Sequence, residues 1–127
     1  TFKDYFTFAV DRNPYDKMIS HYWWLRSKRS FMTRDGFGNF IKNHTHKFND
    51  WVKYADSEEV KVDKLIKYED LHNEFKNMPV PYNDELLTTF VKKSEIRQRH
   101  HRIYSDKGRE TIEENFANVI NYFSYMY

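Results

Sequence analysis

The chain has 127 residues, enough for a single domain with one hydrophobic core. Its 21 basic and 19 acidic residues give a net charge of +2, so nucleic acid or anionic lipid is not the default partner and any anion site must be local. The absence of cysteine excludes disulfides and a cysteine nucleophile, and no apolar run reaches the roughly eighteen residues of a membrane span, so the chain is expected to be soluble.

The first predicted element is a largely buried strand from Tyr5 to Val10, in which aromatic and β-branched side chains alternate with others. The strand opens the chain with no leader and no initiating methionine, and we expect further sequence to precede it. A helix is predicted over Pro14–Arg26, because Asn13 suits the N-cap and proline suits the first helical position. Polar residues of this helix, Lys17 among them, are expected away from the core. Its apolar stripe comprises Tyr15, Met18, Ile19, Tyr22 and Leu25.

A polar, glycine-containing stretch follows this helix and is expected to form a loop. Periodicity then predicts alternating helices and a strand in the rest of the chain. In chain order these are a helix over Phe37–Phe48, a strand over Val60–Lys67, a short helix over Glu69–Asn77, a helix over Asp84–Lys92 and a closing helix over Asp106–Phe123.

Two predicted strands, each followed by a helix, indicate an α/β fold with a parallel sheet. Parallel strands are normally buried on both faces and need several neighbours, so two of them make a poor sheet. We therefore expect one domain over residues 1–127 that carries only part of its own sheet.

The boundary between the first strand and the first helix has the features of an anion site. Backbone N–H groups of the first helical turn are expected to point outward without partners, and Arg12 supplies a forked donor that matches phosphate oxygens. Ser20 lies about two turns into the helix, away from the apolar stripe, where its hydroxyl can bond a phosphate shared with Arg12. An arginine after a strand and a serine on a polar helix face are also common without any ligand.

The segment FTFAVDRNPYDKMISHYWW resembles the 3'-phosphate-binding motif of sulfotransferases. In that motif a strand is followed by Arg-Asn-Pro-x-Asp and by a serine eight residues after the arginine. The resemblance implies that Arg12 and Ser20 bind the 3'-phosphate of 3'-phosphoadenosine 5'-phosphosulfate, which is the sulfuryl donor of the family. It further implies in-line transfer of a sulfuryl group to a hydroxyl or amine acceptor, without a metal ion.

The stretch FNDWVKYADSEEVKVDKLIKYEDL resembles a second segment of the same family, in which a short apolar strand ends in an aromatic residue, Glu, Asp and Leu. The resemblance implies that Tyr68 stacks against the adenine and that Glu69 caps the following helix. From the residues alone, Tyr68 can equally close the core.

The stretch KKSEIRQRHHRIYSDKGRETIEENFANVINYFSY resembles the basic loop and closing helix of the branch that includes carbohydrate sulfotransferases. It implies that Lys93, Ser94 and Arg99 reach the cofactor phosphate, although such a basic run can also be a solvated face. The expected partners are the nucleotide donor and a small-molecule or carbohydrate acceptor. The family context implies the cytoplasm for a bacterial enzyme and the Golgi lumen for a eukaryotic carbohydrate enzyme.

The 5'-phosphosulfate loop of the family has no counterpart in this sequence, since no G-x-x-x-x-G-K-[ST] motif is present. The fold implied by the resemblance is therefore the C-terminal part of a P-loop-like, three-layer nucleotide-binding fold that lacks its N-terminal strand and that loop. The family's catalytic base usually lies between the two phosphate motifs, so no catalytic residue is assigned. The isolated chain is expected to have little or no transferase activity.

Two histidine pairs, His44 with His46 and His100 with His101, are not expected to form a metal site, because two imidazoles do not fill a tetrahedral site. The rival interpretation is a non-catalytic module that binds RNA or a protein partner, favoured by the 19% aromatic content and the basic loop. The spacing of the aromatics on periodic apolar faces argues against RNA. An incomplete sheet also favours self-association through its exposed edge.

Overall fold

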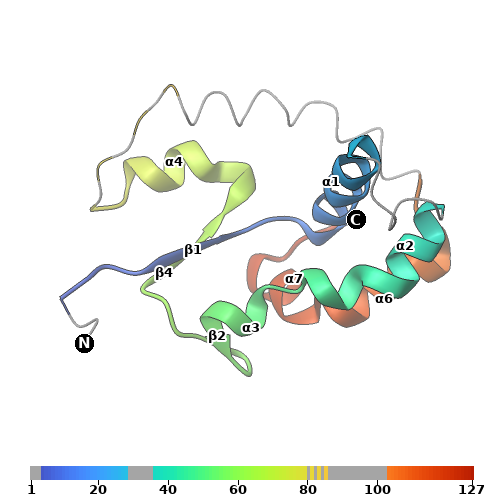
Figure 1. Cartoon of the computed structure of the whole chain (residues 1–127). Helices are drawn as coiled ribbons and strands as arrows, with labels where there is room; N and C mark the ends of the chain where they lie inside the picture. Colours follow the sequence, from blue (N-terminus) through green and yellow to red (C-terminus); the bar gives the residue numbers. More distant parts are fainter. Residues whose placement is uncertain (1–3, 29–35, 80, 82, 84, 86–102) are drawn as a thin grey trace.

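The computed structural model describes residues 4–28, 36–79, 81, 83, 85 and 103–127. These residues form an α/β arrangement, as predicted (Figure 1). In chain order the elements are β1 (Phe8–Asp11), α1 (Pro14–Ser27), α2 (Phe37–His44), the 3-10 turn η2 (Thr45–Phe48), α3 (Trp51–Tyr54), β2 (Ala55–Asp56), β3 (Glu59–Val60), β4 (Lys64–Lys67), the 3-10 turn η3 (Tyr68–Asp70), α4 (Leu71–Lys76), α6 (Asp106–Asn115) and α7 (Ala117–Phe123).

Strands β1 and β4 form a two-stranded parallel sheet, which confirms the predicted pairing of the two apolar strands. Their register runs from Phe8 opposite Lys64 to Asp11 opposite Lys67. The predicted strand over Val60–Lys67 is shorter than expected, because its first residue belongs instead to an antiparallel hairpin of β2 and β3. The part of the chain that is described does not show a three-layer P-loop fold.

The prediction that the first strand is largely buried is wrong. The strand begins at Phe8 rather than Tyr5, and the side chains of Phe8 and Val10 are 40% and 41% exposed. Successive side chains of a strand point to opposite faces. Ala9 packs against the main core, whereas on the opposite face the Phe8 ring contacts Phe75 of the small cluster around α4 edge-on. That cluster contains Ile66 of β4, and within the described residues it leaves Phe8 and Val10 partly exposed.

Helix α1 forms where the sequence predicts it and extends one residue further, to Ser27. Its N-cap is Asn13, whose side-chain oxygen accepts a hydrogen bond of 2.9 Å from the backbone N–H of Tyr15. Pro14 occupies the first helical position, where a missing N–H costs nothing. The apolar stripe of α1 is buried as predicted, with Leu25 half-buried at its end.

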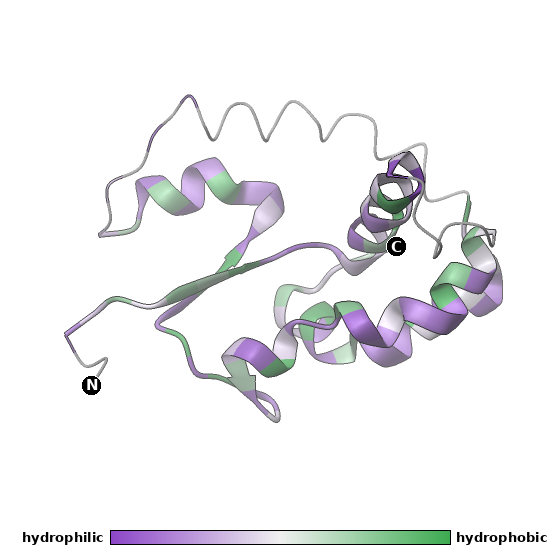
Figure 2. Ribbon diagram, viewed as in Figure 1, coloured by the Kyte–Doolittle hydropathy of each residue, from purple (hydrophilic) through white to green (hydrophobic). Residues whose placement is uncertain are grey.

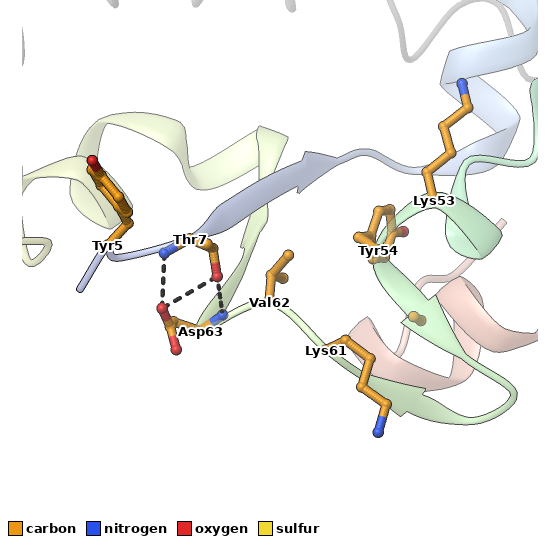
Figure 3. Close-up of a pocket in the computed structure, with 8 residues that line it drawn as sticks. Tyr5, Thr7, Lys53, Tyr54, Lys61, Val62 and Asp63 are labelled. Carbon is orange, nitrogen blue, oxygen red and sulfur yellow. Dashed lines mark hydrogen bonds between the residues drawn. The ribbon is translucent and has the colours of Figure 1, made fainter. Parts of the chain in front are cut away.

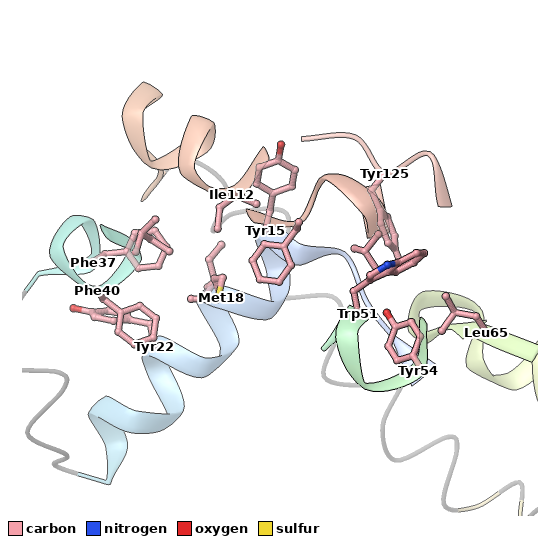
Figure 4. Packing of buried hydrophobic residues seen from close by; sticks show 14 residues of the cluster. Tyr15, Met18, Tyr22, Phe37, Phe40, Trp51, Tyr54, Leu65, Ile112 and Tyr125 are labelled. Atoms are coloured by element: carbon pink, nitrogen blue, oxygen red, sulfur yellow. The ribbon is translucent and has the colours of Figure 1, made fainter. Parts of the chain in front are cut away.

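The main core joins α1 to α2, α3, β4 and the closing helices, and its side chains interdigitate in Figure 4. Figure 2 shows apolar and polar residues interspersed along these helices, as expected of helices with one face in the core. The predicted helix over Phe37–Phe48 is α-helical only to His44, after which the buried Thr45 hydroxyl bonds the carbonyl of Ile41 and the chain tightens into η2. Its apolar residues Phe37, Phe40 and Ile41 are buried in the main core, and Phe48 packs against it.

The predicted closing helix over Asp106–Phe123 is two helices, α6 and α7, that meet at Phe116. The backbone of Phe116 leaves helical geometry at φ −113° and ψ 22°, which lets its ring enter the core. The predicted short helix over Glu69–Asn77 begins with η3 and continues as α4. The predicted helix over Asp84–Lys92 lies outside the described residues. No helix in the described ranges is long and apolar enough to cross a bilayer.

Candidate functional site

The site lies at the carboxyl ends of β1 and β4, where ligands commonly bind in open α/β sheets. Arg12 follows the last residue of β1, and Tyr68 follows the last residue of β4. Because the two strands are parallel and in register, these two residues reach the same edge of the sheet. The guanidinium carbon of Arg12 lies 4.7 Å from the centroid of the Tyr68 ring, a cation–π contact. Two site residues predicted from separate segments are therefore adjacent.

Glu69 connects this edge of the sheet to the start of α1 and to the C-terminal tail. One carboxylate oxygen accepts a hydrogen bond of 2.5 Å from the backbone N–H of Asn13, and the other accepts one of 2.8 Å from the Tyr125 hydroxyl. The prediction that Glu69 caps the following helix is wrong, because the N-cap of α4 is Asp70, which makes no side-chain capping bond. The carboxylate is instead drawn to the neighbouring turn, which offers it a backbone donor.

Three backbone donors at the turn between β1 and α1 are bonded within the chain, and one of them, the N–H of Tyr15, belongs to the first helical turn, whose donors the sequence predicts to be free. The N–H of Arg12 bonds the carboxylate of Asp11 at 2.8 Å, and the N–H of Asn13 bonds Glu69. The N–H of Tyr15 bonds the Asn13 side chain. These three donors already have acceptors within the chain. An anion that used these three N–H groups would have to displace their present acceptors, whereas the Arg12 side chain and the helix dipole can attract it directly.

Ser20 lies exposed on α1, one turn beyond the half-buried Asp16. Ser20 and Arg12 would both donate hydrogen bonds to a phosphate and need not contact each other, so their shared binding of one phosphate stays a prediction. The Asp16 carboxylate is on the same side of the helix as Ser20, so a phosphate bound at Ser20 would need the positive charge of Arg12 to offset this repulsion. The remaining predicted ligands, Lys93, Ser94 and Arg99, lie outside the described residues.

A buried ionic network lies directly beneath the site, and the sequence did not predict it. The ammonium of Lys17 is 3.2 Å from a carboxylate oxygen of Asp11 and 2.6 Å from one of Asp50. Asp11 also accepts a hydrogen bond from the Tyr54 hydroxyl. Asp11 and Lys17 are only 5% and 6% exposed, so the expectation that Lys17 lies away from the core is wrong. No spacing signal marks this lysine, because its two partners come from different elements.

The charges of the network shift the pKa values of its members. Burial opposes ionisation of Asp50, but the hydrogen bonds from Lys17 and Lys53 outweigh it and hold the pKa of this carboxyl below its usual range. Burial and the hydrogen bond to Asp11 raise the pKa of Tyr54, so its hydroxyl stays protonated and remains a donor. The hydrogen bonds of this network join the end of β1 to α1 and to the segment that carries Asp50 and Tyr54.

His21 is expected to make the stability of this region pH-dependent. Burial, followed by the positive charges of Lys17 and Arg12, lowers the pKa of His21, whose ring stacks on Phe48 at 4.4 Å between centroids. A histidine with a lowered folded-state pKa takes up protons more readily when unfolded, so the free energy of unfolding should fall as the pH drops below about 6.5.

Urea unfolding at a series of pH values from about 8 to about 5 tests this expectation. The variant His21→Gln should lose less stability across that range than the wild type. Parallel curves for the two proteins would show that His21 does not contribute to the pH dependence.

A separate pocket of about 610 Å³ lies at the amino ends of the same strands (Figure 3). Its wall includes Thr7 and Asp63, which are joined by hydrogen bonds between the Asp63 carboxylate and both the backbone and hydroxyl of Thr7. The side chains of Lys53 and Lys61 also line it. This pocket lies at the end of the sheet opposite to Arg12 and Tyr68, so it does not extend the candidate anion site.

Searches of protein-family models, of curated proteins and of solved structures found no match to the chain. Within the described ranges, no group of three or more His, Cys, Asp or Glu side chains is arranged to hold a metal ion. The candidate site is thus defined by its own geometry, which is a cation on an aromatic ring at the carboxyl edge of a parallel sheet, beside the start of a helix.

Proposed function

We propose that this chain is part of a sulfotransferase that transfers a sulfuryl group from 3'-phosphoadenosine 5'-phosphosulfate to a hydroxyl or amine acceptor, in particular a carbohydrate. The proposal assigns this chain the half of the site that binds the 3'-phosphate. Its main support is the contact between Arg12 and Tyr68 at the carboxyl ends of two neighbouring parallel strands. The sequence resemblance had selected both residues as cofactor ligands from segments far apart in the chain.

Each residue has a definite role in this proposal. Arg12 binds the 3'-phosphate through its forked guanidinium, and Tyr68 holds the guanidinium against its ring and stacks against the adenine. Ser20 supplies a hydroxyl to the same phosphate. The chemistry of sulfuryl transfer would require a lysine and a base that this chain does not provide by any motif. We therefore expect no sulfated product from the isolated chain, even with donor and acceptor present.

Calorimetric titration with adenosine 3',5'-bisphosphate and with 5'-AMP tests the proposed site. The wild type should bind the bisphosphate more tightly, because only this ligand carries the 3'-phosphate. The variant Arg12→Ala should lose about 10- to 100-fold in affinity for the bisphosphate, the equivalent of a charge-assisted hydrogen bond of about 1.5 to 3 kcal/mol. The affinity for 5'-AMP should change little.

Arg26→Ala is the matched control for this experiment. Arg26 is also on α1 and also lies over an aromatic ring, that of Trp23 at 5.7 Å, but it is at the far end of the helix. It should leave the affinity for both ligands unchanged. Equal binding of the bisphosphate and 5'-AMP by the wild type would contradict the 3'-phosphate site. Nucleic-acid binding that is unchanged in Arg12→Ala and weakens steeply with salt would instead favour the RNA-binding alternative.

A further inference from the structure

The pairing of β1 with β4 continues beyond the last hydrogen-bonded residues of the ladder. The register ends with Asp11 opposite Lys67. The next residues in line are Arg12 and Tyr68, which form the cation–π contact, and then Asn13 and Glu69, which form the backbone-to-carboxylate hydrogen bond. Two successive residues of one chain segment are thus held by two successive residues of the other.

Asn13 is held in this arrangement from three directions. Its backbone N–H donates to Glu69, and its side-chain oxygen accepts from the backbone N–H of Tyr15. Its side-chain nitrogen donates to the backbone carbonyl of Met126 at 3.3 Å. The residue immediately after Arg12 therefore has a defined orientation relative to β4, to α1 and to the C-terminal tail.

The C-terminal tail in turn fixes Glu69. The Tyr125 hydroxyl donates to the carboxylate oxygen that Asn13 does not use, and the ammonium of Lys67 lies 5.1 Å from the centroid of the Tyr125 ring. Tyr125 is itself buried, 9% exposed, and packs in the main core. Figure 4 shows its ring beside the rings of Trp51 and Tyr54. The Glu69 carboxylate is consequently anchored to a rigid part of the fold.

We propose that Glu69 is a positioning residue for the anion site: its carboxylate, anchored by Tyr125, holds the Arg12–Asn13 backbone so that the Arg12 guanidinium stays on Tyr68. This inference rests on the proposed function only for the identity of the ligand. A carboxylate cannot itself be a phosphate ligand, since like charges repel. Its contribution must come from the hydrogen bonds, which fix the neighbouring cation before the ligand arrives.

Comparing Glu69→Ala with Glu69→Gln distinguishes the effect of the hydrogen bonds of Glu69 from the effect of its negative charge. Glutamine has nearly the same shape, so its carbonyl oxygen can accept from Asn13 and its amide can donate to the Tyr125 oxygen. Alanine removes both bonds. Tyr125→Phe, which removes only one hydroxyl, serves as a second and milder variant that leaves the core packing in place.

The primary measurement is the NMR chemical shift of the Arg12 side chain, which requires no ligand. A guanidinium held over an aromatic ring is displaced from its free-arginine shift by the ring current of Tyr68. We expect Glu69→Ala to lose most of this displacement, Tyr125→Phe to lose part of it, and Glu69→Gln to keep it. Arg26, over Trp23, should be unchanged in all three variants.

The second measurement is the ratio of affinities for adenosine 3',5'-bisphosphate and 5'-AMP. Glu69→Ala should reduce this ratio about tenfold, the effect of about one lost charge-assisted hydrogen bond, whereas Glu69→Gln should retain or slightly increase it. If Glu69 has a purely structural role, Glu69→Ala should lower the affinities for both nucleotides equally and leave their ratio unchanged.

An unchanged Arg12 shift in Glu69→Ala would overturn the inference, as would an equal loss of the shift in Glu69→Ala and Glu69→Gln. If Glu69→Ala does not fold, the Arg12 shifts of Tyr125→Phe and Glu69→Gln decide the question in the same way. A wild type that does not distinguish the two nucleotides would contradict the proposed function, while the Arg12 shift would still support or overturn the positioning role.

Discussion

Replacing Asp11 by alanine is expected to lower the free energy of unfolding by about 3 to 5 kcal/mol, the usual cost of removing one partner from a buried ion pair. The ammonium of Lys17 would keep only Asp50 as a charged partner within the network. The buried Tyr54 hydroxyl and the part-buried backbone N–H of Arg12 would also lose their acceptor. All three losses occur at one carboxylate, which is why the effect should be large.

Urea unfolding followed by circular dichroism measures this effect, with Lys53→Ala as the control. Lys53 belongs to the same network, since its ammonium lies 2.7 Å from Asp50, but its side chain is 72% exposed. Exposed ion pairs contribute about 0 to 1 kcal/mol, so Lys53→Ala should have little effect. Similar costs for the two variants would mean that the buried carboxylate is not the centre of the network. The Asp11→Ala variant should also weaken nucleotide binding, because Asp11 orients the turn that carries Arg12.

Replacing Phe40 by alanine is expected to lower the free energy of unfolding by about 3 to 5 kcal/mol. The Phe40 side chain on α2 is fully buried, with 0% exposure, and its ring packs against Tyr22 of α1 and Phe48 of η2. The alanine variant would leave a cavity between α1 and α2. Natural domains are stable by only about 5 to 15 kcal/mol, so this single change could remove a large share of the total.

Thermal and urea unfolding should show a graded series at this position. Phe40→Leu should cost less than Phe40→Ala because it leaves a smaller cavity. Trp24→Ala is the control for loss of a large aromatic ring, since Trp24 is 58% exposed and its removal should change stability by about 0.5 kcal/mol or less. A small effect of Phe40→Ala would show that α2 is not an integral part of the core.

The elements that the sequence predicts well are those whose signals are local. The helix from Pro14 has an N-cap, a proline at the first position and an apolar stripe, and all three features depend on residues within a few positions of one another. The two strands that form the sheet are recognisable from short apolar runs. The closing segment has a clear helical period, but its break at Phe116 depends on where that ring meets the core and has no local signal.

The candidate site likewise has features that local sequence predicts and features that depend on residues remote in the chain. Arg12 and Tyr68 were each selected from their own segment, but their contact depends on the parallel register of β1 and β4. The acceptor of the Asn13 N–H is Glu69, which is 56 residues away in the sequence, so no local pattern predicts this hydrogen bond. The short α3 and the hairpin after it were not predicted, since elements of two to four residues are too short to show a period.

By itself, the sequence determined the α/β class, the parallel strand pair and the two residues at the edge of the sheet, because capping, periodicity and motif spacing are properties of neighbouring positions. Only the tertiary structure decided that Lys17 is buried between Asp11 and Asp50, and that Glu69 holds the turn after Arg12. The physical reason is that a charged side chain is buried only when its partners arrive from other elements, and the positions of those partners depend on how the whole chain packs.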